Sequence, residues 1–111
     1  MNRLVPVPLQ GPLPCAGQLV EVPEARYDWL RIDMSPLTQA VTDGTAWLHY
    51  DRGVDPEHFV LPQAGPARVW LPVPRRQALR AVRLPVEPAL TVRTMAAVVS
   101  RHSTEKGEAR A

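Results

Sequence analysis

The residues that could bind a metal ion fall between His49 and His58. His49 and Asp51 are two positions apart, so they would share one face of a strand, and His58 follows a short acidic loop. This spacing matches no established ligand motif, and three histidines scattered along the chain are more typical of surface or hydrogen-bonded side chains. The acidic residues between them lack the Asp-x-Asp-x-Asp-Gly order of a calcium loop. We therefore predict no metal site and no cofactor.

The nucleophilic side chains do not indicate an enzyme. Cys15 lies in the segment GPLPCAG, where the sequence offers no base positioned to activate its thiol. Ser35, Ser100 and Ser103 lie in no nucleophile-elbow sequence. A single cysteine also excludes an intramolecular disulfide and a zinc site built from several cysteines. We expect a non-catalytic protein that is made in the cytoplasm.

The arginine-rich segment PRRQALRAVRLP, residues 74–85, allows two interpretations. As a helix it would be short and amphipathic and could bind nucleic acid, and as a strand it alternates less cleanly. We predict a strand, because the segment is short, Pro85 disfavours helical geometry at Leu84, and the neighbouring segments have strand patterns. The net charge of only +2 makes nucleic acid an unlikely partner. Arg75 and Arg76 are kept as candidate ligand or interface residues.

Trp29 and Trp70 are the other candidates for contact with a ligand or a partner. Each is two positions from an arginine, Arg31 or Arg68, so each pair would share one face of a strand. An exposed indole beside an arginine can stack on a base of single-stranded nucleic acid or on a sugar ring. Core or interface packing is the more common role of large aromatic residues in a small domain. A ligand-binding module for glycan or single-stranded nucleic acid is therefore the alternative function.

The elements that would position these residues are short β-strands. Thirteen prolines disfavour long helices, and the apolar residues between them tend to alternate with polar ones. The predicted strands lie near 18–22, 26–34, 37–42, 45–50, 58–62, 67–73, 78–86 and 89–100. A type I′ turn at Asp43–Gly44 is expected to join the third and fourth strands. The pattern predicts an all-β fold, a single antiparallel β-sandwich or jelly roll of about seven to eight short strands.

The last predicted strand, LTVRTMAAVV, is expected to alternate without interruption. One face would then carry Leu90, Val92, Ala96 and Val98. The opposite face would carry Thr91, Arg93 and Met95.

The N-terminal segment, residues 1–14, is both apolar and rich in proline. It is too apolar for a solvated tail, yet its prolines cannot donate the hydrogen bonds of a central strand. We therefore predict an extended arm that docks on another subunit or partner. The residues expected to make this contact are Leu4, Val5, Val7, Leu9 and Leu13. Residues 15–100 are predicted to form the β-sandwich domain, and residues 101–111 a polar tail.

These features together predict a structural or interaction protein that acts through subunit contacts. The expected partners are protein subunits, either further copies of the chain or a larger assembly. We expect no membrane association, because no stretch approaches the ~20 apolar residues of a spanning helix. Compact sandwiches with an apolar arm are typical of structural proteins of viral particles, so one expected form is a capsid-stabilising (decoration) subunit of a virion.

Overall fold

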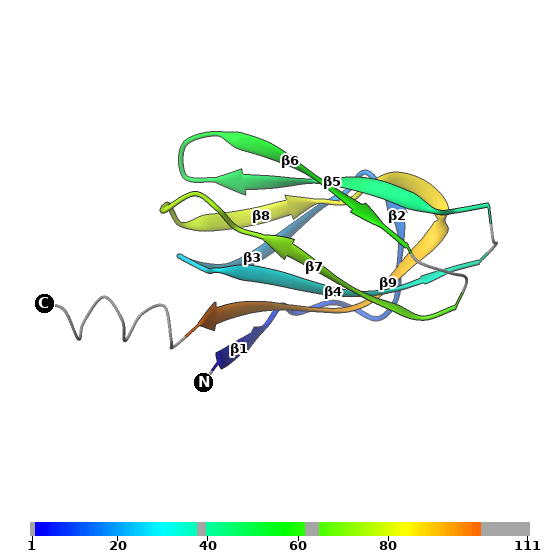
Figure 1. The fold of residues 1–111 in the computed structure, drawn as a ribbon, viewed down its shortest axis with the longest axis horizontal. Helices are drawn as coiled ribbons and strands as arrows, with labels where there is room; N and C mark the ends of the chain where they lie inside the picture. The colour runs from blue at the N-terminus through cyan, green and yellow to red at the C-terminus, as the bar shows by residue number, and fades with distance from the viewer. Residues whose placement is uncertain (1, 38–39, 62–64, 101–111) are drawn as a thin grey trace, which may run out of the picture.

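The computed structural model describes residues 2–37, 40–61 and 65–100. The described chain is all β, and its strands form two antiparallel sheets that pack against each other (Figure 1). Among the described residues, no helix is long and apolar enough to cross a membrane. The tail predicted for residues 101–111 lies outside the described residues.

The first sheet, sheet A, contains five strands. They are β1 (Asn2–Pro6), β2 (Leu13–Ala16), β9 (Val86–Ser100), β4 (Trp29–Pro36) and β7 (Ala67–Pro72). β1 and β2 both pair with β9, β9 pairs with β4, and β4 pairs with β7. β9 is therefore the strand that connects the N-terminal segment to the rest of sheet A.

The second sheet, sheet B, contains four strands. In spatial order they are β3 (Leu19–Ala25), β8 (Leu79–Arg83), β5 (Asp43–Tyr50) and β6 (Val54–Val60). Across both sheets the pairing is nested: β1 and β2 pair with β9, β3 with β8, β4 with β7, and β5 with β6. The described chain therefore has the topology of one long hairpin, in which the chain turns back between β5 and β6. From the ends of this hairpin inward, the paired strands lie alternately in sheet A and sheet B.

Buried and exposed side chains alternate along the strands, which shows which face of each strand points outward. In β4, the side chains of Leu30, Ile32 and Met34 are fully buried, whereas the residues between them are partly exposed. The buried set meets side chains of sheet B, such as Leu48 and Val82, in one core. Burial of one such side chain stabilises the fold by roughly 1.5–3 kcal/mol, so the opposite register of β4 would be strongly unfavourable.

β9 contains a β-bulge that the sequence analysis did not anticipate. Asp33 of β4 pairs with Thr94, but the next residue, Met34, pairs with Val92. Arg93 is therefore an extra residue in β9. Because one residue is inserted, the alternation of inward and outward side chains shifts by one position at the bulge.

The face assignment predicted for the second half of β9 is wrong for this reason. Met95 and Ala97 belong to the core. Ala96 and Val98 pair with outward-facing residues of β4 and therefore lie on the outer face of sheet A. They are nevertheless buried. The uninterrupted alternation predicted for this strand holds only up to the bulge.

The type I′ turn predicted at Asp43–Gly44 is also wrong. Both residues lie within β5, and Gly44 does not have a positive φ angle. The described part of the strand predicted at 37–42 is not a strand, and residues 38–39 lie outside the described residues. Gly44 instead pairs with Phe59 of β6, whose ring occupies the space beside the glycine. The glycine is explained by packing across the two strands and not by turn geometry.

The N-terminal segment forms an edge of sheet A. β1 pairs with β9 from Asn2 opposite Ser100 to Pro6 opposite Ala96, and β2 pairs with the first half of β9. Between β1 and β2, the N–H of Val7 donates a hydrogen bond of 2.9 Å to the carbonyl of Met95. Prolines are tolerated in an edge strand because many of its N–H groups have no ladder partner. The domain boundary predicted at residue 15 falls inside β2.

Candidate functional site

The outer face of sheet A brings the two candidate tryptophans together. Trp29 of β4 pairs with Pro72 of β7, and Arg31 of β4 pairs with Trp70 of β7. Directly paired residues of antiparallel strands point to the same face, so the two indoles are diagonal neighbours with Arg31 beside them. The exposed fractions are 42% for Trp29 and 46% for Trp70. The prediction that each tryptophan shares a face with the arginine two positions away is confirmed.

Leu4 extends this surface to the edge of the sheet. Leu4 pairs with Val98, and Val98 pairs with Trp29, so all three lie on the outer face. Val98 is buried, whereas Leu4 is 49% exposed. We call the surface made by Leu4, Trp29 and Trp70 the apolar patch. Its members come from three strands that are far apart in the sequence, β1, β4 and β7.

The other residues of the predicted arm pack on the core of their own chain. Val7 is buried within that core. Val5, Leu9 and Leu13 are partly buried against it. The prediction that this segment contacts another subunit is therefore carried forward for Leu4, which is the exposed member of the set.

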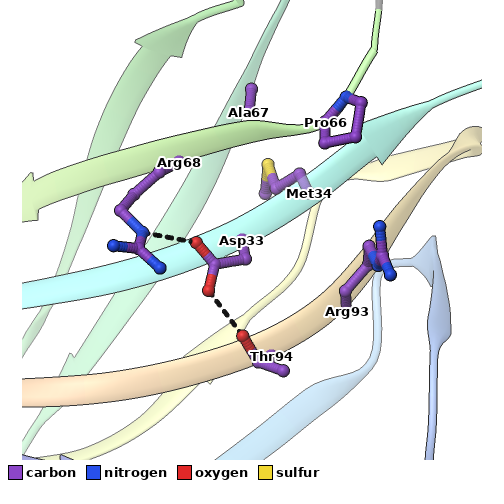
Figure 2. Close-up of a pocket in the computed structure, with 7 residues that line it drawn as sticks. All are labelled: Asp33, Met34, Pro66, Ala67, Arg68, Arg93 and Thr94. Carbon is purple, nitrogen blue, oxygen red and sulfur yellow. Dashed lines mark hydrogen bonds and ion pairs between the residues drawn. The ribbon is translucent and has the colours of Figure 1, made fainter.

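The outer face becomes polar beyond the apolar patch. Oδ1 of Asp33 accepts a 2.8 Å hydrogen bond from Nε of Arg68, and Oδ2 accepts a 2.6 Å hydrogen bond from the Thr94 hydroxyl. Figure 2 shows Asp33 between these two side chains, with Arg68 to its left and Arg93 to its right. The hydrogen bond from Arg68 is the main cause that holds the pKa of Asp33 below its ordinary value. Asp33 is therefore a carboxylate at neutral pH, and both of its oxygens are occupied.

Two hollows adjoin on this face. One, of about 410 Å³, is lined by Asp33 and Arg68, and the other, also of about 410 Å³, is lined by Leu4 and Arg31. Arg93 and Thr94 line both hollows, because the bulge in β9 leaves both side chains exposed. The hollows therefore join the polar end of the face to the β1 edge.

Two of the arginines on this face have unused hydrogen-bonding capacity. Nε of Arg31 lies 3.8 Å from Oδ2 of Asp33, an ion-pair distance that is too long for a hydrogen bond. This Nε is buried and has no hydrogen-bond partner in the described part of the chain. Arg93 makes no ion pair within the same ranges. Arg93, which is exposed, can therefore donate to a bound acceptor without losing an existing ion pair.

Arg75 and Arg76 do not belong to a strand of sheet A. They lie in the loop before β8, which is a strand as predicted. The Arg75 guanidinium donates hydrogen bonds of 2.6 and 2.8 Å to the two oxygens of Asp55, and lies 5.3 Å from the centre of the Tyr50 ring. Arg75 also donates to the carbonyl of Arg52 at 2.7 Å. Arg75 therefore joins two loops of the fold, whereas Arg76 is exposed.

The metal and nucleophile candidates do not form a site. His58 contacts Thr45 and Asp43 across β5 and β6, at 3.4 and 3.5 Å. In residues 2–37, 40–61 and 65–100, no group of three metal-ligating side chains could hold an ion. Cys15 is buried, and burial, with a smaller effect of the Glu87 charge, raises the pKa of its thiol to about 11. Such a thiol is a weak nucleophile at neutral pH.

No protein-family model matches the chain, and no curated protein is significantly similar to it. The geometry of the described residues is therefore the basis for a functional assignment. Within that geometry, the outer face of sheet A brings exposed aromatic, aliphatic and basic side chains together.

Sequence reasoning missed the contacts that Asp33 makes with Arg68 and Thr94. Alternation along each strand is consistent with Asp33 and Arg68 on outer faces, but it does not show that β4 pairs with β7 in this register. The role of Thr94 was hidden by the bulge at Arg93, which places Thr94 on the outer face although it is two positions from the core residue Val92. No local signal in the sequence marks this bulge.

Proposed function

We propose that the chain is a non-catalytic structural or interaction protein that binds another protein subunit through the outer face of sheet A. The observation that carries this proposal is the apolar patch, in which Leu4, Trp29 and Trp70 are each more than two-fifths exposed on one face. Exposed apolar patches mark interaction surfaces, and tryptophan and arginine are enriched at the energetic centres of protein interfaces. Arg31 lies directly beside the patch.

The nested strand pairing supports a jelly roll as the detailed form of the fold. If β1 and β2 are counted as one interrupted edge strand, the first strand pairs with the last, the second with the last but one, and so on inward. Jelly rolls are frequent among viral capsid and lectin domains. On this analogy of fold, we propose a viral particle as the setting, with the chain as a capsid-stabilising (decoration) subunit.

A second candidate function is ligand binding at the same face. The alternation of Trp29 with Arg31 and of Trp70 with Arg68 supports stacking of a base or sugar ring with basic groups nearby. Sugar hydroxyls need acceptors as well as donors, however, and the carboxylate of Asp33 is already occupied. This observation favours an anionic ligand over a neutral glycan.

Site-specific photo-crosslinking in cells that naturally produce the chain tests the proposed function. p-Benzoylphenylalanine replaces Trp70 or, as a matched control, Trp47, which is 42% exposed but lies on sheet B. We expect discrete protein adducts from position 70 and none from position 47, and the adduct mass distinguishes a second copy from another protein. Equal adducts from both positions, or none from either, would contradict the proposal. Adducts to nucleic acid from position 70 would favour the alternative function.

A further inference from the structure

We infer that the outer face of sheet A binds an acidic surface of a different protein and not a second copy of the same face. This inference rests on the proposed function and adds to it the chemistry of the partner. It is carried by the charges on that face and by the hydrogen-bonding capacity that remains free there.

The outer face offers more hydrogen-bond donors than acceptors. Its charged members beside the apolar patch are Arg31, Arg68, Arg93 and Asp33. Each oxygen of Asp33 already accepts a hydrogen bond, one from Arg68 and one from Thr94. Within the described residues, the buried Nε of Arg31 has no hydrogen-bond partner and Arg93 has no ion-pair partner. Carboxylates are the protein groups that complement guanidinium donors of this kind.

The ratio of arginines to carboxylates on this face differs from that at two arginine sites around sheet B. Elsewhere, Arg80 lies 3.6 Å from Glu24 and 3.7 Å from Asp51, and Arg75 forms a two-point hydrogen bond with Asp55. The chain as a whole carries a net charge of only +2, which is too small to impose a basic character on every surface. On the outer face of sheet A, by contrast, three arginines lie near the one carboxylate of Asp33.

A second copy is a poor occupant of this face. If two copies met through it, the three arginines of one would approach the three of the other, with one already occupied aspartate on each side. Like charges brought together across an interface oppose association. A surface that carries carboxylates removes this repulsion and provides acceptors for the exposed Arg93.

The aliphatic part of the face favours a protein over a nucleic acid. The apolar lining of the hollow at the β1 edge includes Leu4, Pro6, Val7, Leu9 and Ala96, and its polar lining consists of Arg31, Arg93 and Thr94. Aliphatic walls accommodate an apolar side chain, whereas nucleic-acid grooves rely on aromatic planes that alternate with many basic residues. An acidic segment that contains a large apolar residue fits both parts of the face. Its apolar residue would cover the patch, and its carboxylates would meet the arginines.

The test uses the full chain labelled with ¹⁵N, in which each of the three tryptophans gives an indole N–H signal. The probe is a random copolymer of glutamate and tyrosine, titrated at low and high salt. We expect the signals of Trp29 and Trp70 to shift in a saturable, salt-sensitive manner while that of Trp47 stays in place. Equal shifts of all three signals would show that the copolymer binds non-specifically and would overturn the inference.

Charge variants show whether the arginines of this face select the probe. The double variant Arg68→Gln/Arg93→Gln is compared with Arg52→Gln/Arg76→Gln, which removes the same charge from exposed loop positions. We expect the first to weaken copolymer binding by at least about tenfold and the second by less than about twofold. Equal weakening in both would mean that net charge, and not this face, controls binding.

Two further titrations separate the other occupants. A single-stranded oligothymidylate that shifts Trp29 and Trp70 at lower concentration than the copolymer would overturn the inference in favour of nucleic acid. Shifts that depend on protein concentration without any probe would overturn it in favour of a second copy. If the copolymer fails but photo-crosslinking from position 70 still yields a different protein, the proposed function stands and only the acidic character of the partner is wrong.

Discussion

Gly44→Ala is expected to destabilise the domain by a mechanism that can be distinguished from turn strain. Gly44 in β5 faces Phe59 in β6, and a methyl group added at Gly44 would lie 2.6 Å from Cζ of the ring and 3.1 and 3.2 Å from its two Cε atoms. These distances are well inside van der Waals contact, so the ring has to move. Phe59 is only 5% exposed and is part of the core, so any movement disturbs neighbouring core side chains.

The expected loss of stability in Gly44→Ala follows from the cost of overpacking. Added methyl groups in a packed core typically cost about 1–3 kcal/mol, and the loss of the ring's fit over a glycine acts in the same direction. For a domain of this size, each 1 kcal/mol lowers the melting temperature by roughly 4–8 °C. We therefore expect Gly44→Ala to melt about 5–20 °C below the wild type.

The assay is thermal and urea unfolding of four proteins: wild type, Gly44→Ala, Phe59→Leu and the double variant. If the clash is the cause, the leucine relieves it, and the double variant is more stable than the sum of the two single effects predicts. Gly44→Asn provides a second comparison, because asparagine tolerates positive φ and would be mild in a turn but not beneath a ring. Additive effects in the cycle, together with a mild Gly44→Asn, would refute the packing explanation.

Three further predictions concern the N-terminal edge, the Asp33 carboxylate and the Cys15 thiol. Deleting residues 1–7 should lower the free energy of unfolding by about 2–4 kcal/mol in urea titrations, because Val7 leaves the core and β1 leaves β9; an unchanged midpoint would contradict this. Asp33→Asn should lower the free energy of unfolding by roughly 1 kcal/mol at pH 7, a value that allows for the exposure of Arg68. Because Arg68 lowers the pKa of folded Asp33, the stability difference between wild type and Asp33→Asn should have its full size above about pH 5. It should disappear as the pH falls and the carboxylate becomes protonated. A difference of the same size at about pH 2 would contradict this prediction. With a pKa of about 11, Cys15 should react with Ellman's reagent slowly in the native protein and rapidly in urea, and fast native labelling would show that it is accessible.

Local pattern in the sequence was sufficient for much of the strand content and for the orientation of several strands. Leu30, Ile32 and Met34 are buried as their alternation indicates, and the outward placement of Trp29 and Trp70 followed from the same period. Six of the predicted segments overlap β3, β4, β5, β7, β8 and β9, and a further one overlaps β6. These features depend on contacts with solvent or core that each strand makes by itself.

The remaining features depend on contacts between distant segments. Nothing near Leu4 in the sequence shows that it lies across β9 from Trp29, because that proximity requires the pairing of β1 with β9 and of β9 with β4. The bulge at Arg93 changes phase without a glycine or proline to mark it. At Gly44, the Asp-Gly pair has the residue types of a turn, and only the ring of Phe59 across the ladder explains why glycine is required within a strand.

The position of β9 has a consequence for how the chain folds as it is synthesised. β1 and β2 emerge first, but their pairing partner is the last strand of the described chain, and β4 lies between β7 and that same strand. At a synthesis rate of about 5–20 residues per second, β1 waits for its partner for on the order of 5–20 seconds. During that interval Val5 and Val7 have no core to cover them, so the nascent chain presents an apolar proline-rich segment to chaperones. Sheet A, and with it the face that carries Leu4 and Trp29, is completed only when residues 86–100 arrive.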